Sequence, residues 1–319
     1  MNISVLGCGR WGTFIAWYLD KVDHNVLLWG RDASQNFLEL KNSRKNKYLA
    51  LESSVKLSAD LNKAVDSADV IIISISCQAL RSFMEKLNSK SLKNKTIVLC
   101  MKGIEKASGK TLTQVVSEFI DDSTNVAIWV GPGHVEDFVK GIPNCMVIDS
   151  KNEKIKKSLV ESFSSDLIRF YYGSDLIGNE IGSAAKNVIG IAAGMLDGFS
   201  YESLKGALMA RGTREIARLI KAMGGNEMSA YGLCHLGDYQ ATLFSPHSHN
   251  RKFGELFVKG ESFQELAEGV ATTEALIKLG EKYSVDLPIC KAINKIIKDK
   301  EDPKKVLSSL FMRSIKTEF

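Results

Sequence analysis

A glycine-rich turn between an apolar run and an amphipathic stretch constrains this chain most strongly. Residues 7–12 read GCGRWG and match the pattern GxGxxG, directly after the apolar run 3–7. Such glycines let the backbone approach a pyrophosphate, and the first turn of the following helix offers free N–H groups. The turn therefore predicts a dinucleotide site, and a glycine-rich turn without a ligand is the alternative. The expected contacts are Gly7, Gly9, Arg10, Trp11 and Gly12.

Further apolar runs of strand length follow, with amphipathic stretches between them. This rhythm is typical of a parallel sheet flanked by helices. Residues 70–73 read VIII, so both faces of that strand should be covered, as in a doubly wound α/β sheet of the Rossmann type. The expected strands are 3–7, 25–29, 69–74, 96–100 and 126–131, followed by two candidates at 145–149 and 167–172.

From about residue 174 the β-branched runs end, and apolar residues recur at helical spacing through residue 310. A chain of 319 residues exceeds what one hydrophobic core usually organises, so we expect two domains. Residues 1–173 would bind the dinucleotide, and residues 174–319 would form an all-helical substrate-binding and catalytic domain. In 175–196 one face is apolar, and Lys186 lies on a second face of small and polar residues.

The net charge and the cysteines limit the kinds of ligand and partner that we expect this chain to bind. Lys and Arg number 42 against 37 Asp and Glu, a mild excess that suits a small anionic ligand. The basic stretch 41–47 lacks the aromatic residues of a nucleic-acid groove, so no nucleic-acid partner is expected. Six separated cysteines without CxxC suggest neither a zinc ribbon nor a disulfide framework, and His247 and His249 lack further ligands, so we expect no metal.

The location of the chain is predicted from the same cysteines and from hydropathy. Widely separated cysteines fit a reducing cytoplasm. No segment approaches the roughly 20 apolar residues that span a bilayer, so no membrane partner is expected.

The residues after the second expected strand bear on the choice of cofactor. Residues 29–32 read WGRD, where many NAD enzymes carry an acid for the ribose hydroxyls. Arg31 would instead favour a 2′-phosphate, although Asp32 could still take the acid's place. We therefore expect NADPH, with NADH possible.

Seven short blocks follow one another along the chain: GCGRWGT, VLLWGRD, MKGIE, VGPGHVED, AAKNVIGIAAGMLDG, LGD and SHNRKFG. Their order resembles that of bacterial glycerol-3-phosphate dehydrogenases over nearly the whole chain. That resemblance implies a Rossmann domain followed by a helical domain like that of 6-phosphogluconate dehydrogenase. It also implies reversible reduction of dihydroxyacetone phosphate to sn-glycerol 3-phosphate by NAD(P)H, for glycerophospholipid synthesis, in a cytoplasmic homodimer.

The resemblance also implies catalytic roles. Lys186 would exchange a proton with the substrate oxygen, and a lysine that only snorkels from a helix is the alternative. Lys102, after the strand at 96–100, would support the carbonyl oxygen and contact both substrate and cofactor. Asp238 would orient Lys186, unless it merely caps a helix.

Binding residues follow from the same blocks. The resemblance assigns Gly131, Gly133, Ser248, His249 and Asn250 to the substrate. It assigns Val135, His249 and Glu268, besides Lys102, to the cofactor. Two positions depart from the family, which usually has serine or threonine at Gly133 and arginine at His249. The Gly133 backbone, Arg251 or a protonated His249 could compensate for the lost phosphate contact.

Two other functions remain open from the sequence. A dehydrogenase of another small hydroxy compound, of the β-hydroxyacid type, would also use a helix-borne lysine, and the altered phosphate block allows it. A non-catalytic NADPH-binding sensor would keep the glycine turn, but Lys102, Lys186 and Asp238 argue against it.

Overall fold

The chain separates into two compact units. The computed structural model describes residues 1–87, 89–312 and 317. Unit 1 comprises Met1–Lys102 and Lys110–Glu180, and unit 2 comprises Gly103–Gly109 and Ile181–Phe319. The division at 180/181 lies inside helix α8 (Leu176–Gly198). The domain boundary at 173/174 stays a prediction.

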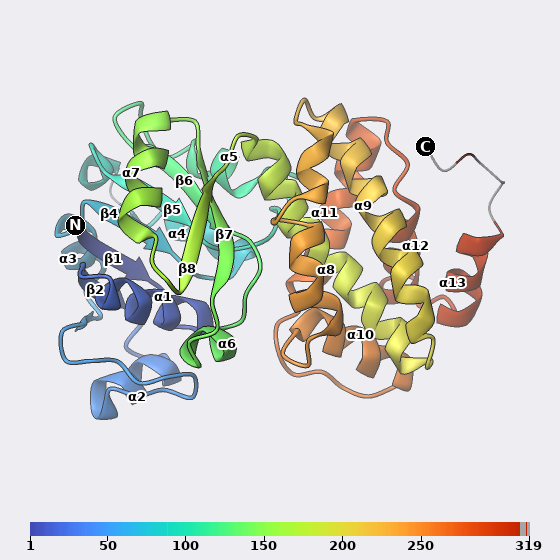
Figure 1. Cartoon of the computed structure of the whole chain (residues 1–319), viewed down its shortest axis with the longest axis horizontal. Coiled ribbons are helices and arrows are strands. Elements are labelled where there is room, and N and C mark those ends of the chain that lie inside the picture. Colours follow the sequence, from blue (N-terminus) through green and yellow to red (C-terminus); the bar gives the residue numbers. More distant parts are fainter. Residues whose placement is uncertain (88, 313–316, 318–319) are drawn as a thin grey trace. The chain divides into compact units, whose positions relative to one another are not determined.

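Unit 1 is built on an eight-stranded sheet with the order β3-β2-β1-β4-β5-β6-β7-β8 (Figure 1). Neighbouring strands are parallel except for β6 and β7. All seven expected strands are present, and the short β3, with the sequence KLS, was not predicted. The strands are β1 (Asn2–Leu6), β2 (Asn25–Trp29), β3 (Lys56–Ser58), β4 (Val70–Ile73), β5 (Thr96–Leu99), β6 (Asn125–Val130), β7 (Asn144–Ser150) and β8 (Ile168–Tyr172).

Helices and short turns cover both faces of this sheet. Val70 and Ile72 belong to the core cluster that α1 and α7 complete, whereas Ile71 and Ile73 point to the opposite face and are equally buried. The doubly wound fold class is therefore confirmed. The helical segments are α1 (Arg10–Lys21), α2 (Gln35–Ser43), α3 (Leu61–Asp66), η1 (Cys77–Ala79), α4 (Leu80–Met84), η2 (Ser89–Leu92), α5 (Leu112–Val116), α6 (Val135–Val139) and α7 (Glu153–Phe163).

The regular elements of unit 2 among the described residues are all helical, as the spacing predicted. Its longest helix, α8, is buried around most of its circumference, which explains its uniformly apolar and small side chains. No helix in the described ranges is both long and apolar enough to cross a bilayer. The other segments are η3 (Glu202–Leu204), α9 (Lys205–Ala222), η4 (Glu227–Tyr231), η5 (Leu236–Asp238), η6 (Gln240–Phe244), α10 (His249–Lys259), α11 (Glu268–Lys282), α12 (Pro288–Ile297) and α13 (Pro303–Phe311).

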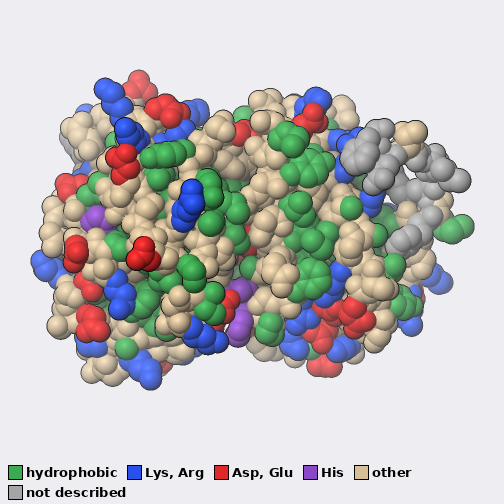
Figure 2. All heavy atoms as spheres, in the orientation of Figure 1, with side chains coloured by type: hydrophobic (Ala, Val, Ile, Leu, Met, Phe, Trp, Pro, Cys, Tyr) green, Lys and Arg blue, Asp and Glu red, His purple; other side chains and the backbone are tan. Residues whose placement is uncertain are grey.

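Figure 2 shows how the charged side chains are distributed on one face. On the face drawn in Figure 2, acidic and basic side chains are interspersed and do not gather into one basic groove. The net charge of +5 is therefore not concentrated on this face.

Two glycines allow α8 and α10 to touch through their backbones. A Cβ at Gly194 would overlap the carbonyl oxygen of Arg251, and a Cβ at Gly254 would overlap that of Ile191. Further along α8, a Cβ at Gly190 would lie 3.4 Å from the Cβ of Asn250. The close crossing therefore fixes the first turn of α10 beside the helix that carries Lys186.

We expect Gly194→Ala to lower the free energy of unfolding by about 3 kcal/mol, because the added methyl group overpacks a backbone contact. Urea unfolding followed by circular dichroism measures the change. Gly206→Ala in α9 is the matched control, since a Cβ there meets nothing within 4 Å. The control should change stability by less than about 1 kcal/mol, in the stabilising direction. Equal losses in the two variants would contradict the crossing.

Candidate active site

The glycine turn of unit 1 combines two packed glycines with one that faces open space. A Cβ at Gly7 or Gly12 would overlap the carbonyl oxygens of Ser74 and Gly7 respectively, and Gly7 has a φ of +120°. A Cβ at Gly9 meets nothing within 4 Å, and Gly9 is the N-cap of α1 without a side-chain cap. The packing of the chain therefore does not require a glycine at this position, whereas a pyrophosphate approaching the helix N-terminus does.

Two side chains next to the turn also fit a dinucleotide. The Nε1 of Trp11 is buried and has no hydrogen-bond partner among the described residues, so it can donate to a ligand oxygen. Arg31 is exposed directly after β2, while Asp32 lies 3.5 Å from the Nζ of Lys41. The Arg10 side chain forms an ion pair with Glu136. This set of donors suits the phosphates of a nicotinamide dinucleotide.

Lys102 and Gly131 meet at the carboxyl edge of the sheet, beyond β5 and β6. The Lys102 Nζ donates to the Gly131 carbonyl oxygen at 2.6 Å. Ligands of open α/β sheets bind at this edge. The sequence placed both residues there, and the structure brings them into contact.

In unit 2 a buried ion pair joins Lys186 of α8 to Asp238 of η5. The Lys186 Nζ lies 2.7 Å from the Asp238 Oδ2, and the two side chains are 9% and 0% exposed. The Nζ also donates to the Thr242 Oγ1 at 2.7 Å, and this hydroxyl donates to the Asp238 carbonyl oxygen at 2.7 Å. Two acceptors therefore fix the direction of the ammonium group.

Thr242 was not predicted from the sequence, although a signal existed. It lies four residues after Asp238, the spacing at which two residues share one side of a helix. Asp238 ends η5, and Thr242 lies in η6, a π-helical segment whose turn is wider than that of an α-helix. This turn holds the two residues on the same side of the backbone.

A neutral histidine supports this turn. The His235 Nδ1 lies 2.8 Å from the carbonyl oxygen of Gly182, so Nδ1 carries the proton and Nε2 accepts from the Tyr239 hydroxyl at 2.7 Å. Both side chains are 0% exposed. Burial lowers the pKa of His235 to about 4, so the ring adds no positive charge beside Lys186 at neutral pH.

Ser248 and Asn250 hold structural hydrogen bonds at the start of α10. The Ser248 Oγ accepts from the Arg251 N–H at 3.3 Å and caps the helix. The Asn250 Oδ1 accepts from the Gly269 N–H at 2.9 Å, which joins α10 to the start of α11. Glu268 is the first residue of α11 and is partly exposed. Among the described residues, no three His, Cys, Asp or Glu side chains cluster as metal ligands.

Two family models match this chain, and together they cover most of it. The model described as NAD-dependent glycerol-3-phosphate dehydrogenase N-terminus matches residues 2–156, and the corresponding C-terminus model matches residues 175–308. The chain belongs to the NAD-dependent glycerol-3-phosphate dehydrogenase family. The predicted family is thereby confirmed, as is its class, the NAD(P)-dependent oxidoreductases.

Individual relatives agree over the full length. A glycerol-3-phosphate dehydrogenase [NAD(P)+] of Thermoanaerobacter sp. (strain X514) is 36% identical over 329 residues, covering 100% of this chain and 99% of the relative. That of Prosthecochloris aestuarii is 37% identical over 335 residues, covering 100% of both. The crystal structure of glycerol-3-phosphate dehydrogenase from Coxiella burnetii superposes with a TM-score of 0.87 at 26% identity, covering 98% of this chain and 99% of that one.

The departure from the glycerol-3-phosphate dehydrogenase pattern at Gly133 has a packing cause. Gly133 has a φ of +142°, and a Cβ there would overlap the ring of Phe138. Phe138 is 1% exposed and stacks on Phe14 with ring centroids 5.0 Å apart. Serine or threonine does not fit beside this ring. Val135, at the start of α6, is 2% exposed, so its backbone is the part that can reach a ligand.

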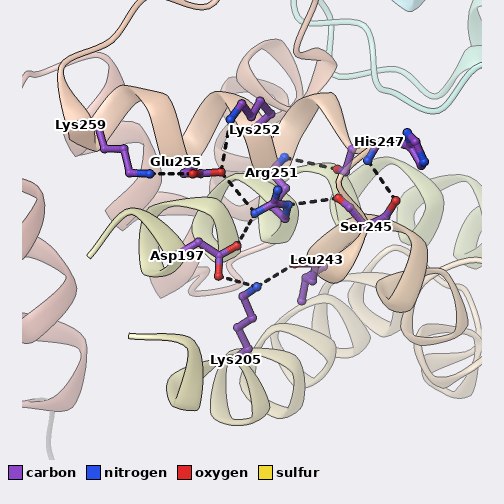
Figure 3. A network of polar contacts seen from close by, with 10 residues as sticks. Asp197, Lys205, Leu243, Ser245, His247, Arg251, Lys252, Glu255 and Lys259 are labelled. Carbon is purple, nitrogen blue, oxygen red and sulfur yellow. Dashed lines mark hydrogen bonds and ion pairs between the residues drawn. The ribbon is translucent and has the colours of Figure 1, made fainter. Parts of the chain in front are cut away.

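The second departure places His249 in an ion pair within unit 2. Its Nε2 lies 2.7 Å from the Glu265 Oε2, and both side chains are about half exposed. Arg251 lies in a separate network of contacts. Its guanidinium donates to the Asp197 carboxylate at 2.7 Å and to the Ser245 carbonyl oxygen at 3.1 Å, and it lies 3.4 Å from Glu255 (Figure 3). Through these contacts Arg251 helps to hold α8 against α10.

We expect the stability of the chain to fall by about 2 kcal/mol between pH 7 and pH 5 through His235 alone. The unfolded histidine binds a proton below about pH 6.5, whereas the folded one resists protonation down to about pH 4. The lowered folded pKa therefore stabilises the fold above pH 6.5, and this contribution is lost as the pH falls. Urea unfolding of wild type and His235→Asn at pH 7, 6 and 5 measures the difference.

His247→Asn is the control, because His247 is exposed and its replacement should keep the wild-type slope of stability against pH. Identical slopes for wild type and His235→Asn would show that His235 does not resist protonation.

Proposed function

We propose that this chain is an sn-glycerol-3-phosphate dehydrogenase that reversibly reduces dihydroxyacetone phosphate with NAD(P)H, for glycerophospholipid synthesis. The observation that carries the proposal is the buried Lys186–Asp238 pair with Thr242, in a chain of the glycerol-3-phosphate dehydrogenase family. Lysine is a proton donor suited to an alkoxide.

A bound nicotinamide supplies the hydride. Reduction leaves negative charge on the substrate oxygen, and Lys186 would donate its proton there or accept one in the reverse direction. Asp238 and Thr242 hold the Nζ of Lys186 in one direction, so little reorganisation is needed when the proton moves. Lys102, held by the Gly131 carbonyl oxygen, would support the carbonyl oxygen of the substrate.

The cofactor would be held first by unit 1. The turn around Gly9 and the N–H of Trp11 suit the pyrophosphate, and the exposed Arg31 favours NADPH over NADH through its 2′-phosphate. Gly7, Arg10, Gly12 and Val135 are expected to line the same site, with Lys102, His249 and Glu268 also expected to contact the cofactor.

The substrate phosphate would be bound by backbone N–H groups around Gly131 and Gly133 and by Ser248, His249 and Asn250. The altered residues 133 and 249 favour, as a second candidate, oxidation of another small hydroxy acid. We further propose a cytoplasmic location, which free thiols at all six cysteines support. A homodimer is proposed from the resemblance alone.

We expect Lys186→Met to reduce the turnover of dihydroxyacetone phosphate at least about 100-fold, because the proton donor is lost, while NADPH affinity stays near the wild-type value. Absorbance of NADPH measures turnover, and calorimetric titration measures affinity. Lys205→Met is the matched control, since Lys205 is another buried lysine of unit 2 in an ion pair, 2.6 Å from Asp197. It should destabilise the chain without a comparable loss of turnover. Wild type acting faster on unphosphorylated keto acids than on dihydroxyacetone phosphate would reject the substrate assignment.

Arg31→Ala tests the cofactor preference. We expect the KM for NADPH to rise about tenfold, because a charge-assisted contact to the 2′-phosphate is lost, and the KM for NADH to stay within about twofold. Initial rates with each cofactor provide the measurement. Asp32→Ala is the control and should not weaken the binding of NADPH. An equal rise in the KM for both cofactors would show that Arg31 does not discriminate between them.

A further inference from the structure

A cavity of about 720 Å³ lies within unit 2, and none of its lining residues belongs to the candidate active site. Most of its lining residues belong to α8, α9, α12 and α13, which Figure 1 labels, and the lining also includes Tyr201, Leu204, Asp286 and Thr317. Small-molecule sites typically have volumes of about 300–1,000 Å³. The cavity is therefore large enough for a ligand of that size.

Much of the wall is hydrocarbon. Leu196 of α8, Leu208 of α9, Ile293 of α12 and Leu307 of α13 all line the cavity. Leu196, Ile293 and Leu307 are each at most 9% exposed, so they form its closed side. An aliphatic chain lying along these residues would leave water in proportion to the apolar area that it covers.

The α9 wall adds positive charge. Arg211, Arg214 and Arg218 are three and four residues apart and share one side of the helix, and Lys304 of α13 also lines the cavity. The Arg211 guanidinium makes no hydrogen bond or ion pair with the residues that the structure describes. Arg218 donates to the carbonyl oxygen of Asp286 at 3.0 Å, which is a neutral partner.

The lining also contains two acidic side chains, Glu215 and Asp286. Glu215 accepts from the backbone N–H groups of Ile289 at 2.8 Å and Cys290 at 3.1 Å, at the start of α12. The Asp286 Oδ1 lies 2.9 Å from the Nζ of Lys291. The lining thus combines hydrocarbon with four cationic side chains, Arg211, Arg214, Arg218 and Lys304, against these two acidic ones.

We propose that this cavity binds a single-chain anionic amphiphile, with its aliphatic chain on the leucine and isoleucine wall and its carboxylate or phosphate head beside Arg211. The excess of cationic side chains in the lining favours an anionic head over a neutral one.

Calorimetric titration of the full chain tests this site with three probes: dodecanoate and dodecyl phosphate below their critical micelle concentrations, and dodecanol below its solubility limit. We expect one anion bound per chain, and dodecanol bound at least tenfold more weakly. The anion that binds more tightly shows whether the site prefers a carboxylate head, as in a fatty acid, or a phosphate head. Dodecanol binding as tightly as both anions would overturn the role of the arginines and with it the proposal.

Variants locate the binding. Arg211→Ala should weaken dodecanoate about tenfold, because one charge-assisted contact is lost. Ala207→Trp replaces an exposed residue of the lining with a bulky one and should abolish binding, with the thermal midpoint showing that the fold persists. Lys221→Ala is the control, a cation of the same helix outside the lining, and should bind as wild type does.

Three other results would overturn the proposal. Binding that survives Ala207→Trp would lie elsewhere on the chain. Binding seen only after the chain is ended at Met312 would assign the cavity to the chain's own C-terminal residues. Sedimentation showing a dimer that Ala207→Trp dissociates would place a second copy on this face.

Discussion

The buried ion pair between Lys186 and Asp238 is the interaction on which the candidate site depends. Moving either charge alone out of water costs several kcal/mol, and their attraction offsets this only when the geometry is good and other polar atoms are satisfied. The contact of 2.7 Å and the hydroxyl of Thr242 provide that geometry. Unit 2 therefore has to keep η5 fixed against α8, and the neutral pair of His235 and Tyr239 does so without adding charge.

Helix α8 contains glycines that lower its intrinsic helix stability, and these glycines make this arrangement possible. Glycine inside a helix costs up to about 1 kcal/mol relative to alanine, yet Gly190 and Gly194 lie in the middle of α8. Their missing side chains allow Asn250 and the backbone of α10 to approach the helix closely. The close crossing brings residues that are about 60 positions apart in the sequence to one place, so the positions of the site are set by backbone contact rather than by flexible side chains.

The apolar pattern was sufficient to predict the sheet, because the strands of a covered parallel sheet are continuous hydrophobic runs. It failed at β3, whose three residues provide no such run, and it carried no information on the antiparallel pairing of β6 with β7. In the site, Lys186 and Asp238 were found through the order of short blocks. Thr242 and His235 were not found, because their partners are contacts such as the Gly182 carbonyl oxygen, which exist only once α8 packs against η5.

The two departures from the family pattern are best understood together with their neighbours. At residue 133 the volume of a hydroxyl-bearing side chain is occupied by the ring of Phe138, so the loop can offer a phosphate its backbone N–H groups but no side chain. At residue 249 the side chain is a histidine whose Nε2 already lies 2.7 Å from the Glu265 Oε2. The Arg251 guanidinium is one of two cations that contact the partly buried Asp197, so moving it to a phosphate would leave Asp197 with Lys205 alone. A phosphate that binds His249 would therefore have to compete with Glu265 for its Nε2.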